Sequence, residues 1–390
     1  MKRWCASLTL ALSLLAVSGC WDNNELDEYG YVQAVAIDSS EDDLIRLTTH
    51  FYNPSNKTEM SGSAKSSTAK GINIVTSAET IFEAVRDVPL KFGRKAKWDH
   101  MRVILIGEKL AQSRNIREIL DYFSRDHEPR GTVLPLIAEG EAADFLNIRP
   151  FIEQTIGQQF KKMETNGAIY TGKTTKIPLY ELAIQMKSPS KTSDIPLIRI
   201  TDSGKEAVVS GIAILKDSKL VDALRGKDTE AYLMLVDKYE SGVLEFPCIG
   251  NAEGMDRRME SIEVIFFRSR LIPHVHGDSV SVDVRIEIKG TIGELKCSRL
   301  KSVEDAELFE EKIAEQVQRR LHHAISIFEH RKADLVGIGN RIYRKNPKQW
   351  KTLEPSWDEI ISRCRFDIHV DVEVLSTGLN VGTPFGYKEK

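Results

Sequence analysis

The sequence has few cysteines, no excess of basic residues and no long hydrophobic run beyond its N-terminus. Cysteine accounts for 5 of 390 residues, and 54 Lys and Arg are slightly outnumbered by 57 Asp and Glu, for a formal net charge of −3. A mildly acidic chain lacks the basic stripe that neutralises nucleic-acid phosphates, so we exclude nucleic acid as a partner. After the N-terminal region no stretch reaches the roughly 18 unbroken apolar residues of a transmembrane helix.

Catalytic motifs are also missing. The sequence has no Gly-x-Ser-x-Gly elbow, no phosphate-binding loop with its lysine and no His-Glu-x-x-His zinc motif. Gly337 and Gly339 lack the third glycine and the preceding strand of a dinucleotide-binding fingerprint. His274 and His276 share one strand face, but no further ligand lies at metal-binding spacing, so a solvated strand end is the simpler interpretation. We therefore expect a protein that is not an enzyme and that needs no cofactor or metal.

The N-terminus has the layout of an export signal. Two basic residues precede an apolar run over residues 6–16, and the small residues 17–19 lead to Cys20. This run is too short to span a bilayer, which takes about 20 helical residues, so it directs export without remaining as an anchor. The layout resembles the lipobox of bacterial lipoproteins, which implies cleavage after Gly19 and an N-palmitoyl and S-diacylglycerol modification of Cys20. The alternative is an ordinary secretory signal cut near Ser18, with Cys20 an incidental thiol.

Removal of the signal peptide, residues 1–19, leaves a chain long enough for about two or three domains. Residues 20–28 are polar and form a tether that reaches at most about 30 Å, which keeps the folded part close to the bilayer. With Cys20 acylated, Cys248, Cys297 and Cys364 remain, an odd number that cannot form a complete disulfide framework. Each lies in an apolar or strand-like segment, so we expect buried thiols that pack as small hydrophobic side chains. An exported protein without disulfides fits the outer face of a Gram-positive membrane.

Residues 29–200 are expected to form an N-terminal α/β region, which could divide into two subdomains. The polar segment 53–70 predicts a mobile loop, and 188–193 has the composition of a linker. Strand-like and helical patterns alternate along the region, which favours an α/β or α+β unit. Strands are predicted at 29–37, 44–52, 102–107 and 132–138, and helices at 77–91, at about 116–123 and over most of 141–186.

A second unit is expected over residues 206–385, beginning with a hairpin of 208–215 and 219–221. Unbroken alternation of apolar and polar residues over 280–288 and 366–374 predicts two strands, each with one buried face. Between them, apolar residues recur every three or four positions from Phe309 to Phe328, which predicts a long amphipathic helix. We expect an antiparallel sheet packed on this helix, so the fold class is multi-domain α+β. On the wet face of the sheet, acidic residues are expected to pair with cations across the strands: Asp367, Asp371 and Glu373 with Arg285 and Lys289.

Several segments, in order along the chain, resemble the Ger(x)C family, the lipoprotein C subunits of spore germinant receptors. The first, at 19–26, is similar to the family's Gly-Cys-Trp-Asp-x-x-Glu-Leu start. The others lie at 36–38, 80–84, 100–107, 122–126, 211–216, 219–221, 334–339, 347–350, Trp357 and 377–379. His100, Arg125 and Asp126 match family positions, and a structural role is the simpler interpretation for His100.

The resemblance implies a non-enzymatic α+β lipoprotein of the cell membrane, anchored by lipid at its outer face, which in the spore is the inner membrane. It also implies that the chain works with the multispanning A and B subunits of the receptor in the germination response to nutrients. The alternative is a solute-binding lipoprotein of a transport system, which shares the signal and the tether. That class needs two similar α/β lobes, whereas the second half of this chain is expected to differ from the first.

Overall fold

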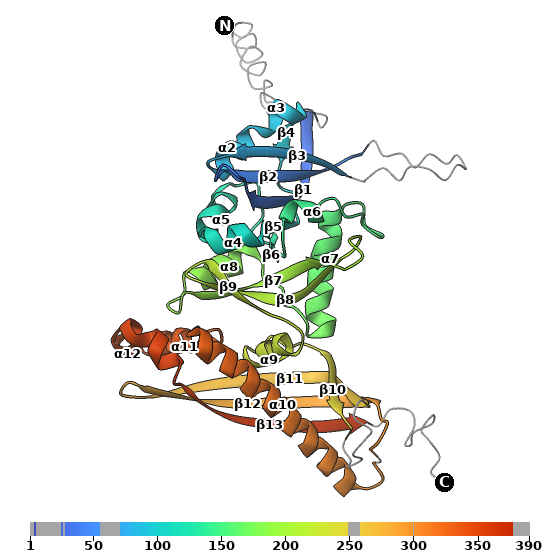
Figure 1. Ribbon diagram of the computed structural model, residues 1–390, viewed down its shortest axis with the longest axis vertical. Helices are drawn as coiled ribbons and strands as arrows, with labels where there is room; N and C mark the ends of the chain where they lie inside the picture. Colours follow the sequence, from blue (N-terminus) through green and yellow to red (C-terminus); the bar gives the residue numbers. More distant parts are fainter. Residues whose placement is uncertain are drawn as a thin grey trace, which may run out of the picture.

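The structure is a computed structural model that describes residues 28–54, 71–248, 258–298 and 300–376, together with Trp4 and Glu25. Cys20, most of the expected tether and residues 55–70 of the expected mobile loop lie outside the described residues. The described chain forms two sheets stacked along the longest axis, with the N-terminal residues at one end and the smaller sheet at the other (Figure 1).

The larger sheet has nine strands in the order β3-β2-β1-β5-β6-β7-β8-β9, with β4 paired to the start of β1. Its centre, from β1 through β5 and β6 to β7, is parallel, and antiparallel strands extend it at both ends. The strands are β1 (Tyr29–Ser39), β2 (Ile45–Tyr52), β3 (Gly71–Ala78), β4 (Lys95–Lys97), β5 (Val103–Gly107), β6 (Leu134–Ala138), β7 (Thr192–Ile200), β8 (Ala207–Lys216) and β9 (Lys219–Leu224).

Helices cover both faces of this sheet, because its central strands are apolar on both sides. Along β1, Val35 and Ile37 pack into one core, and Ala34 and Ala36 pack into the other. The helices of the first core are α2 (Ile81–Arg86), α3 (Val88–Phe92), α4 (Glu108–Ser113), α5 (Ile116–Arg125) and α8 (Leu179–Met186). The helices of the second core are α6 (Ala142–Phe145) and α7 (Ile156–Thr171).

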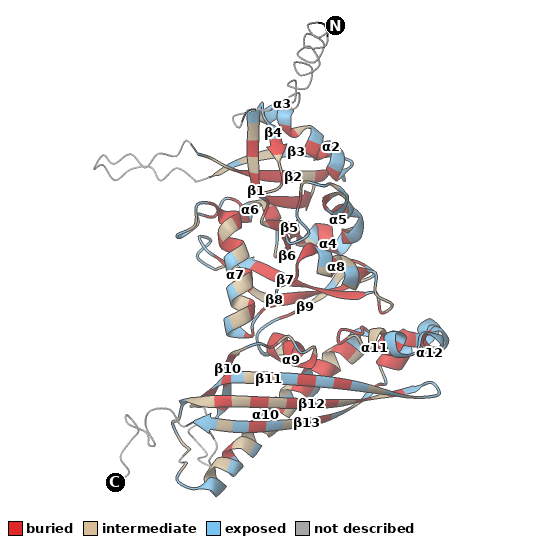
Figure 2. Cartoon of the chain, turned by 180° about the vertical axis from the view of Figure 1, so that it is seen from behind, coloured by how far each residue is buried: buried red, intermediate tan, exposed pale blue. Residues whose placement is uncertain are grey.

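The smaller sheet has the order β10 (Gly242–Pro247), β11 (Met259–His276), β12 (Ser279–Glu294) and β13 (Arg365–Ser376). Buried and exposed residues alternate along its long strands (Figure 2), as the sequence predicts for strands with one wet face. The helix α10 (Val303–Arg331) lies across its dry face, and α9 (Lys227–Leu235) joins the same core. A capping box of Ser302 and Asp305 starts α10. The expected sheet on one long helix is therefore confirmed, as is the α+β class.

The last strand runs in a direction that we did not expect. The smaller sheet is antiparallel from β10 to β12, but β13 pairs parallel to β12. Parallel neighbours need a long crossover connection, and here it consists of α10, α11 (Ile338–Lys345), α12 (Pro347–Leu353), a short 3-10 turn (Glu354–Ser356) and α13 (Trp357–Ile361). The prediction of a purely antiparallel sheet is wrong because periodicity reports which face of a strand is buried, and not its direction.

The parallel register decides which charged residues meet on the wet face. Lys289 pairs with Glu373 as expected, at 2.6 Å between Nζ and Oε2. Asp367 lies opposite Asp283, and Asp371 lies opposite Glu287. The expected pairs with Arg285 do not form among the described residues, because His369 lies opposite that arginine.

Two segments of the larger sheet differ from the sequence-based expectation. Residues 71–78 form β3, whereas we expected a helix from residue 77. The helix begins only after Thr80, whose hydroxyl accepts from the backbone N–H of Glu83, and it breaks at Asp87 before Pro89. The expected linker at 188–193 is a tight turn that enters β7, with Ser190, Thr192 and Ser193 buried. The boundary that we expected near 200–206 is the turn between β7 and β8, neighbours in one sheet, so the domain division stays a prediction.

The expectation of three free thiols is wrong for two of them. Cys248 and Cys297 form a disulfide, with Cα atoms 5.6 Å apart, and only Cys364 among the described cysteines is free and buried. The two residues follow β10 and β12, which flank the start of β11, so the sheet brings together positions 49 residues apart in sequence. Spacing in the sequence does not reveal this neighbourhood.

Glu260, at the start of β11, binds the same segment after β12 that contains Cys297. It is fully buried, and its carboxylate accepts from the backbone N–H groups of Lys296, Cys297 and Ser298 and from the Ser298 hydroxyl, at 2.6–2.9 Å. Burial raises the pKa of Glu260, but these hydrogen bonds more than offset burial and leave the pKa below its usual value. A buried carboxylate and a disulfide therefore hold the segment after β12 together.

Candidate functional site: the junction between the two sheets

The polar side chains with the most specific arrangement lie where the larger sheet meets the helices of the smaller one. On one side of this junction are α8, β7 and the β8–β9 hairpin. On the other side are α9, the end of α10, and α11 to α13 (Figure 1). The junction fixes how the half nearest the N-terminus is oriented relative to the distal sheet.

A buried charge cluster forms the interior of the junction. Asp194 in β7 and Tyr232 in α9 are almost fully buried, and the Tyr232 hydroxyl hydrogen-bonds to Asp194. Lys238, just after α9, lies 3.8 Å from Asp194 and 3.1 Å from Glu181 of α8, measured from Nζ to the carboxylate oxygens. Lys238 thus connects the C-terminal half of the chain to β7 of the larger sheet and to α8, which packs on that sheet.

The pKa directions follow from burial and from these pairings. Burial raises the pKa of Asp194, although Lys238 opposes the shift. For Lys238, burial alone would lower the pKa, but attraction by Asp194 and Glu181 outweighs it and the pKa is raised. Lys238 therefore keeps its charge, and this charge offsets part of the free energy that the burial of Asp194 costs. Asp194 and Tyr232 are buried, whereas Lys238 and Glu181 are partly exposed, and together they connect the two halves.

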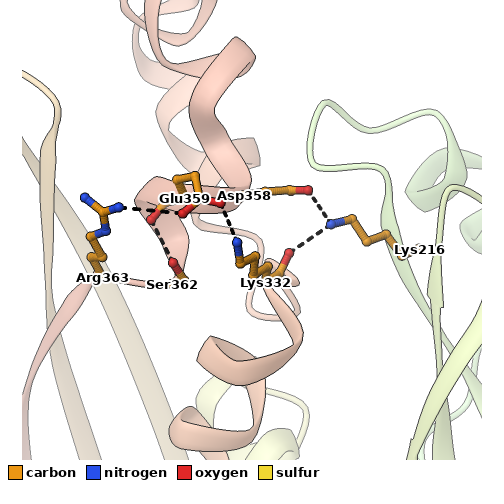
Figure 3. Close-up of polar contacts among 6 residues, drawn as sticks. All are labelled: Lys216, Lys332, Asp358, Glu359, Ser362 and Arg363. Atoms are coloured by element: carbon orange, nitrogen blue, oxygen red, sulfur yellow. Dashed lines mark hydrogen bonds and ion pairs between the residues drawn. The ribbon is translucent and has the colours of Figure 1, made fainter.

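A second set of contacts joins the end of β8 to the helices of the smaller sheet (Figure 3). Lys216 at the end of β8 donates to the Asp358 carboxylate at 2.5 Å and to the Lys332 carbonyl at 3.0 Å. Lys332 in turn pairs with Glu359, which lies 3.6 Å from Arg363. Exposed pairs of this kind contribute about 0–1 kcal/mol each, so they adjust the junction more than they hold it.

Two further contacts cross the junction on either side of this set. Arg331 at the end of α10 pairs with Asp222 of β9 at 2.8 Å. The backbone N–H of Ser190, in the turn before β7, donates to the Asn340 side chain of α11 at 3.1 Å. The segment that we expected to be a linker is therefore bonded to α11 across the junction.

Replacing Lys238 by methionine tests the buried cluster. The variant leaves Asp194 buried without its cation, and breaking such a pair costs on the order of 3 kcal/mol of unfolding free energy. The loss should be larger at pH 8 than at pH 5, because Asp194 avoids part of the cost by binding a proton at low pH. Urea unfolding of the wild type and the variant at the two pH values measures this loss of unfolding free energy. Lys216→Met removes the pair with the exposed carboxylate of Asp358 and the bond to the Lys332 carbonyl, leaves no buried acid unpaired, and as the matched control should cost about 1 kcal/mol or less.

Asp334 starts the helices on the C-terminal side of the junction. It is almost fully buried and accepts from the backbone N–H groups of Ile338 and Gly339, both at 2.7 Å, which caps α11. Burial raises the pKa of Asp334 to about 6, although these hydrogen bonds lower it in part. The Asp-Leu-Val-Gly-Ile-Gly segment at 334–339 is thus a helix start, in which Gly337 adopts a left-handed φ of +69°.

The raised pKa of Asp334 predicts a pH-dependent contribution to stability. Since the folded state binds this proton more tightly than the unfolded chain, the contribution is present below about pH 4 and is lost as the pH rises through about 6. Relative to Asp334→Asn, the wild type should therefore lose about 2 kcal/mol of unfolding free energy between pH 4 and pH 7. Unfolding curves at several pH values measure this difference. Glu354→Gln, at an exposed acid nearby, should follow the wild type; a parallel profile for Asp334→Asn would refute the assignment.

The residues singled out from the sequence occupy structural positions elsewhere. His100 is half exposed and packs edge-on against Tyr31, with ring centroids 5.4 Å apart. Asp126 ends α5, where it accepts from the Tyr122 hydroxyl at 2.9 Å and from the Glu128 N–H at 3.0 Å. Arg125 pairs with Asp121 on the exposed side of the same helix. These roles agree with the structural interpretation.

The histidine and cysteine groups do not form a metal site in the described part of the chain. His274 pairs with Asp283 across the sheet at 3.1 Å, with both side chains partly exposed. Among the described residues, one group of three potential ligands lies close together, Cys248, Glu260 and Cys297, but the sulfurs are bonded to each other and the carboxylate accepts from four donors. Neither thiolate is therefore available to a metal ion.

Sequence reasoning missed the junction cluster. Asp194 stands between the polar residues 190–193 and the apolar run 195–198, so the local sequence does not mark it as a buried acid. Nothing in the local sequence points to Lys238 or Tyr232 as its partner. Among the described helices, none combines the length and apolar character needed to cross a membrane.

Two sequence-family profiles match the chain in succession. The spore germination protein N-terminal domain matches residues 22–200, and the C-terminal domain described as spore germination B3/GerAC-like matches residues 210–378. Spore germination protein B3 of Bacillus subtilis is 26% identical over 94% of this chain and 96% of its own, and protein KC of the same organism is 23% identical over 97% of both chains. Spore germination protein GerQC of Bacillus cereus is 24% identical over 97% of this chain and 99% of its own.

A solved structure supports the fold. The crystal structure of the GerBC protein covers 87% of this chain and 96% of its own, with a TM-score of 0.54 and 22% sequence identity. At this identity the likeness concerns the fold alone. The two profiles together cover most of the sequence, in the order that the motifs predicted, and the chain therefore belongs to the Ger(x)C family of spore germination proteins.

Proposed function

We propose that this protein is a lipid-anchored, non-catalytic C subunit of a spore germinant receptor and is needed for the germination response to nutrients. The observation that carries the proposal is the family match, which runs through residues 22–200 and 210–378 and begins next to the Cys20 lipobox. The relatives named above are spore germination proteins and match over nearly their whole length. The protein would lie at the outer face of the cell membrane, which in the spore is the inner membrane.

The partners in this proposal are the multispanning A and B subunits of the receptor. The tether places the larger sheet near the bilayer, where membrane subunits are within reach. The charge cluster at the junction is consistent with a structural role for the chain, because it connects the larger sheet to the helices of the smaller one. Two connected sheets anchored to the membrane suit a subunit that positions the A and B subunits.

The alternative, a solute-binding lipoprotein, has less support. That class needs two similar α/β lobes that close on a ligand. Here one half contains a nine-stranded mixed sheet with helices on both faces, and the other a four-stranded sheet with a helix on one face. No observation favours this second function.

Co-purification from detergent-solubilised spore membranes tests the proposal. A tagged copy of this chain should retain the A and B subunits, and cross-linking followed by mass spectrometry should place the contacts. An unrelated tagged spore lipoprotein is the control for trapping in shared micelles. Isolation of the chain without either subunit, together with tight binding of an amino acid or sugar in calorimetry, would favour the alternative.

A further inference from the structure

A cavity of about 610 Å³ lies beside the larger sheet, away from the junction. Its walls are Arg102, at the start of β5, and one side of α7 from Gln158 to Asn166, with Glu153 from the loop before that helix. Binding sites for small molecules typically measure about 300–1,000 Å³, so its size suits a small ligand. The cavity belongs to the face of the sheet that α6 and α7 cover.

The cavity is lined by three cations and one acid, so its positive charge exceeds its negative charge. Lys162 is paired with Glu153, at 2.7 Å between Nζ and Oε1. Arg102 and Lys161 form no ion pair and no side-chain hydrogen bond with any described residue, and the Nε atom of Arg102 is buried without a partner. A guanidinium nitrogen withdrawn from water without an acceptor costs free energy, because burial removes its hydration and nothing replaces it.

Two further cations, Lys176 and Arg130, act electrostatically on Lys161. Burial lowers the pKa of Lys161, and repulsion by Arg102, Lys176 and Arg130 lowers it further. Three cations therefore repel Lys161, and Glu164 opposes this repulsion in part.

The buried acid on the same helix compensates these cations only in part. Glu164 lies one turn after Lys161 on α7, fully buried, and one of its oxygens accepts from the Ile177 N–H at 3.2 Å while the other has no partner. Burial raises the pKa of Glu164 well above its usual value, although the nearby Lys176 and Lys161 lower it in part. Its hydrogen bond goes to the backbone of Ile177, and among the described residues it forms no ion pair with Arg102 or Lys161.

We propose that this cavity binds a small multivalent anion that carries carboxylate or phosphate groups. Arg102 and Lys161 would bind its charged groups, since charge-assisted hydrogen bonds from guanidinium and ammonium to such oxygens are the strong ones. Gln158, Thr165 and Asn166 line the same space and supply hydrogen-bonding groups for uncharged parts of the ligand. Arg130 and Lys176 add attraction at longer range. The site does not depend on the proposed receptor role.

Calorimetry on the full mature chain in detergent at low salt tests this inference, with citrate, pyrophosphate and inorganic phosphate as separate probes. We expect saturable binding of citrate or of pyrophosphate, and the stronger of the two identifies carboxylate or phosphate as the recognised group. Binding should weaken as salt rises. Each of Arg102→Gln and Lys161→Gln should weaken binding about 10-fold or more, since a hydrogen bond to a charged group contributes at least that much.

Matched variants separate the cavity from general charge effects. Lys109→Gln removes an exposed lysine of α4 and should bind like the wild type, and Lys161→Arg keeps the charge and should retain binding. The bound anion should also raise the Tm of the wild type and not that of Lys161→Gln. The proposal would be overturned if none of the three probes showed saturable binding, or if both Gln variants bound as tightly as the wild type. Anionic lipid vesicles are a further probe, and binding to vesicles alone would also contradict it.

Discussion

Replacing Cys20 by alanine should abolish lipid attachment and leave either an uncleaved precursor or a protein released from the membrane. A single acyl chain gives only marginal membrane binding, whereas two or more give stable anchoring. With no lipid on residue 20, the mature chain would have no acyl anchor at all. Metabolic labelling with a radioactive fatty acid, followed by membrane fractionation, measures both effects.

Cys5→Ala is the matched control, because it removes a cysteine from the same signal segment and should leave labelling, cleavage and fractionation unchanged. Label that persists on the Cys20→Ala protein would show that the lipid is attached elsewhere. Efficient cleavage near Ser18 in the wild type, with an unmodified thiol at Cys20, would support the ordinary secretory signal instead.

Removing the disulfide should destabilise the smaller sheet more than any single exposed substitution. Cys248 and Cys297 close a loop with a sequence separation of 49 residues, and cross-linking a loop of this length removes unfolded-state entropy equivalent to about 4 kcal/mol. We expect the double variant Cys248→Ser/Cys297→Ser to lose roughly that amount of unfolding free energy. Urea unfolding, followed by circular dichroism, measures the loss.

Reduction of the wild type provides the control. Dithiothreitol should lower the urea midpoint of the wild type toward that of the double variant, and should leave the variant unchanged. A wild-type midpoint that does not respond to the reductant, with free thiols at both positions, would contradict the bond. The segment after β12 should retain part of its order without the disulfide, because Glu260 still binds three of its N–H groups.

The sequence predicts best those elements whose pattern is local. The alternation at 280–288 and the helical spacing from Phe309 to Phe328 correspond to β12 and α10, because each buries one face against the same core. The buried strands at 103–107 and 134–138 are equally visible as short apolar runs. β3 is missed because it is half exposed along most of its length and carries no unbroken run.

What could not be predicted depends on residues far apart in sequence. The direction of β13 is set by the crossover through α10 to α13, and the disulfide joins positions that only the β10-β11-β12 order brings together. The pairing of Lys238 with Asp194 and Glu181 arises where two layers meet, so no segment contains its signal. The two unpaired cations of the cavity, Arg102 and Lys161, come from the residue before β5 and from α7, and neither segment shows that they meet.

The germination rate of spores that lack this gene tests the central claim most directly. The account predicts that such spores lose the response to one class of nutrient and keep their response to germinants that bypass nutrient receptors. A wild-type copy should restore the response, and a Cys20→Ala copy should restore it poorly. Normal germination of the deleted strain with every nutrient tested would contradict the account.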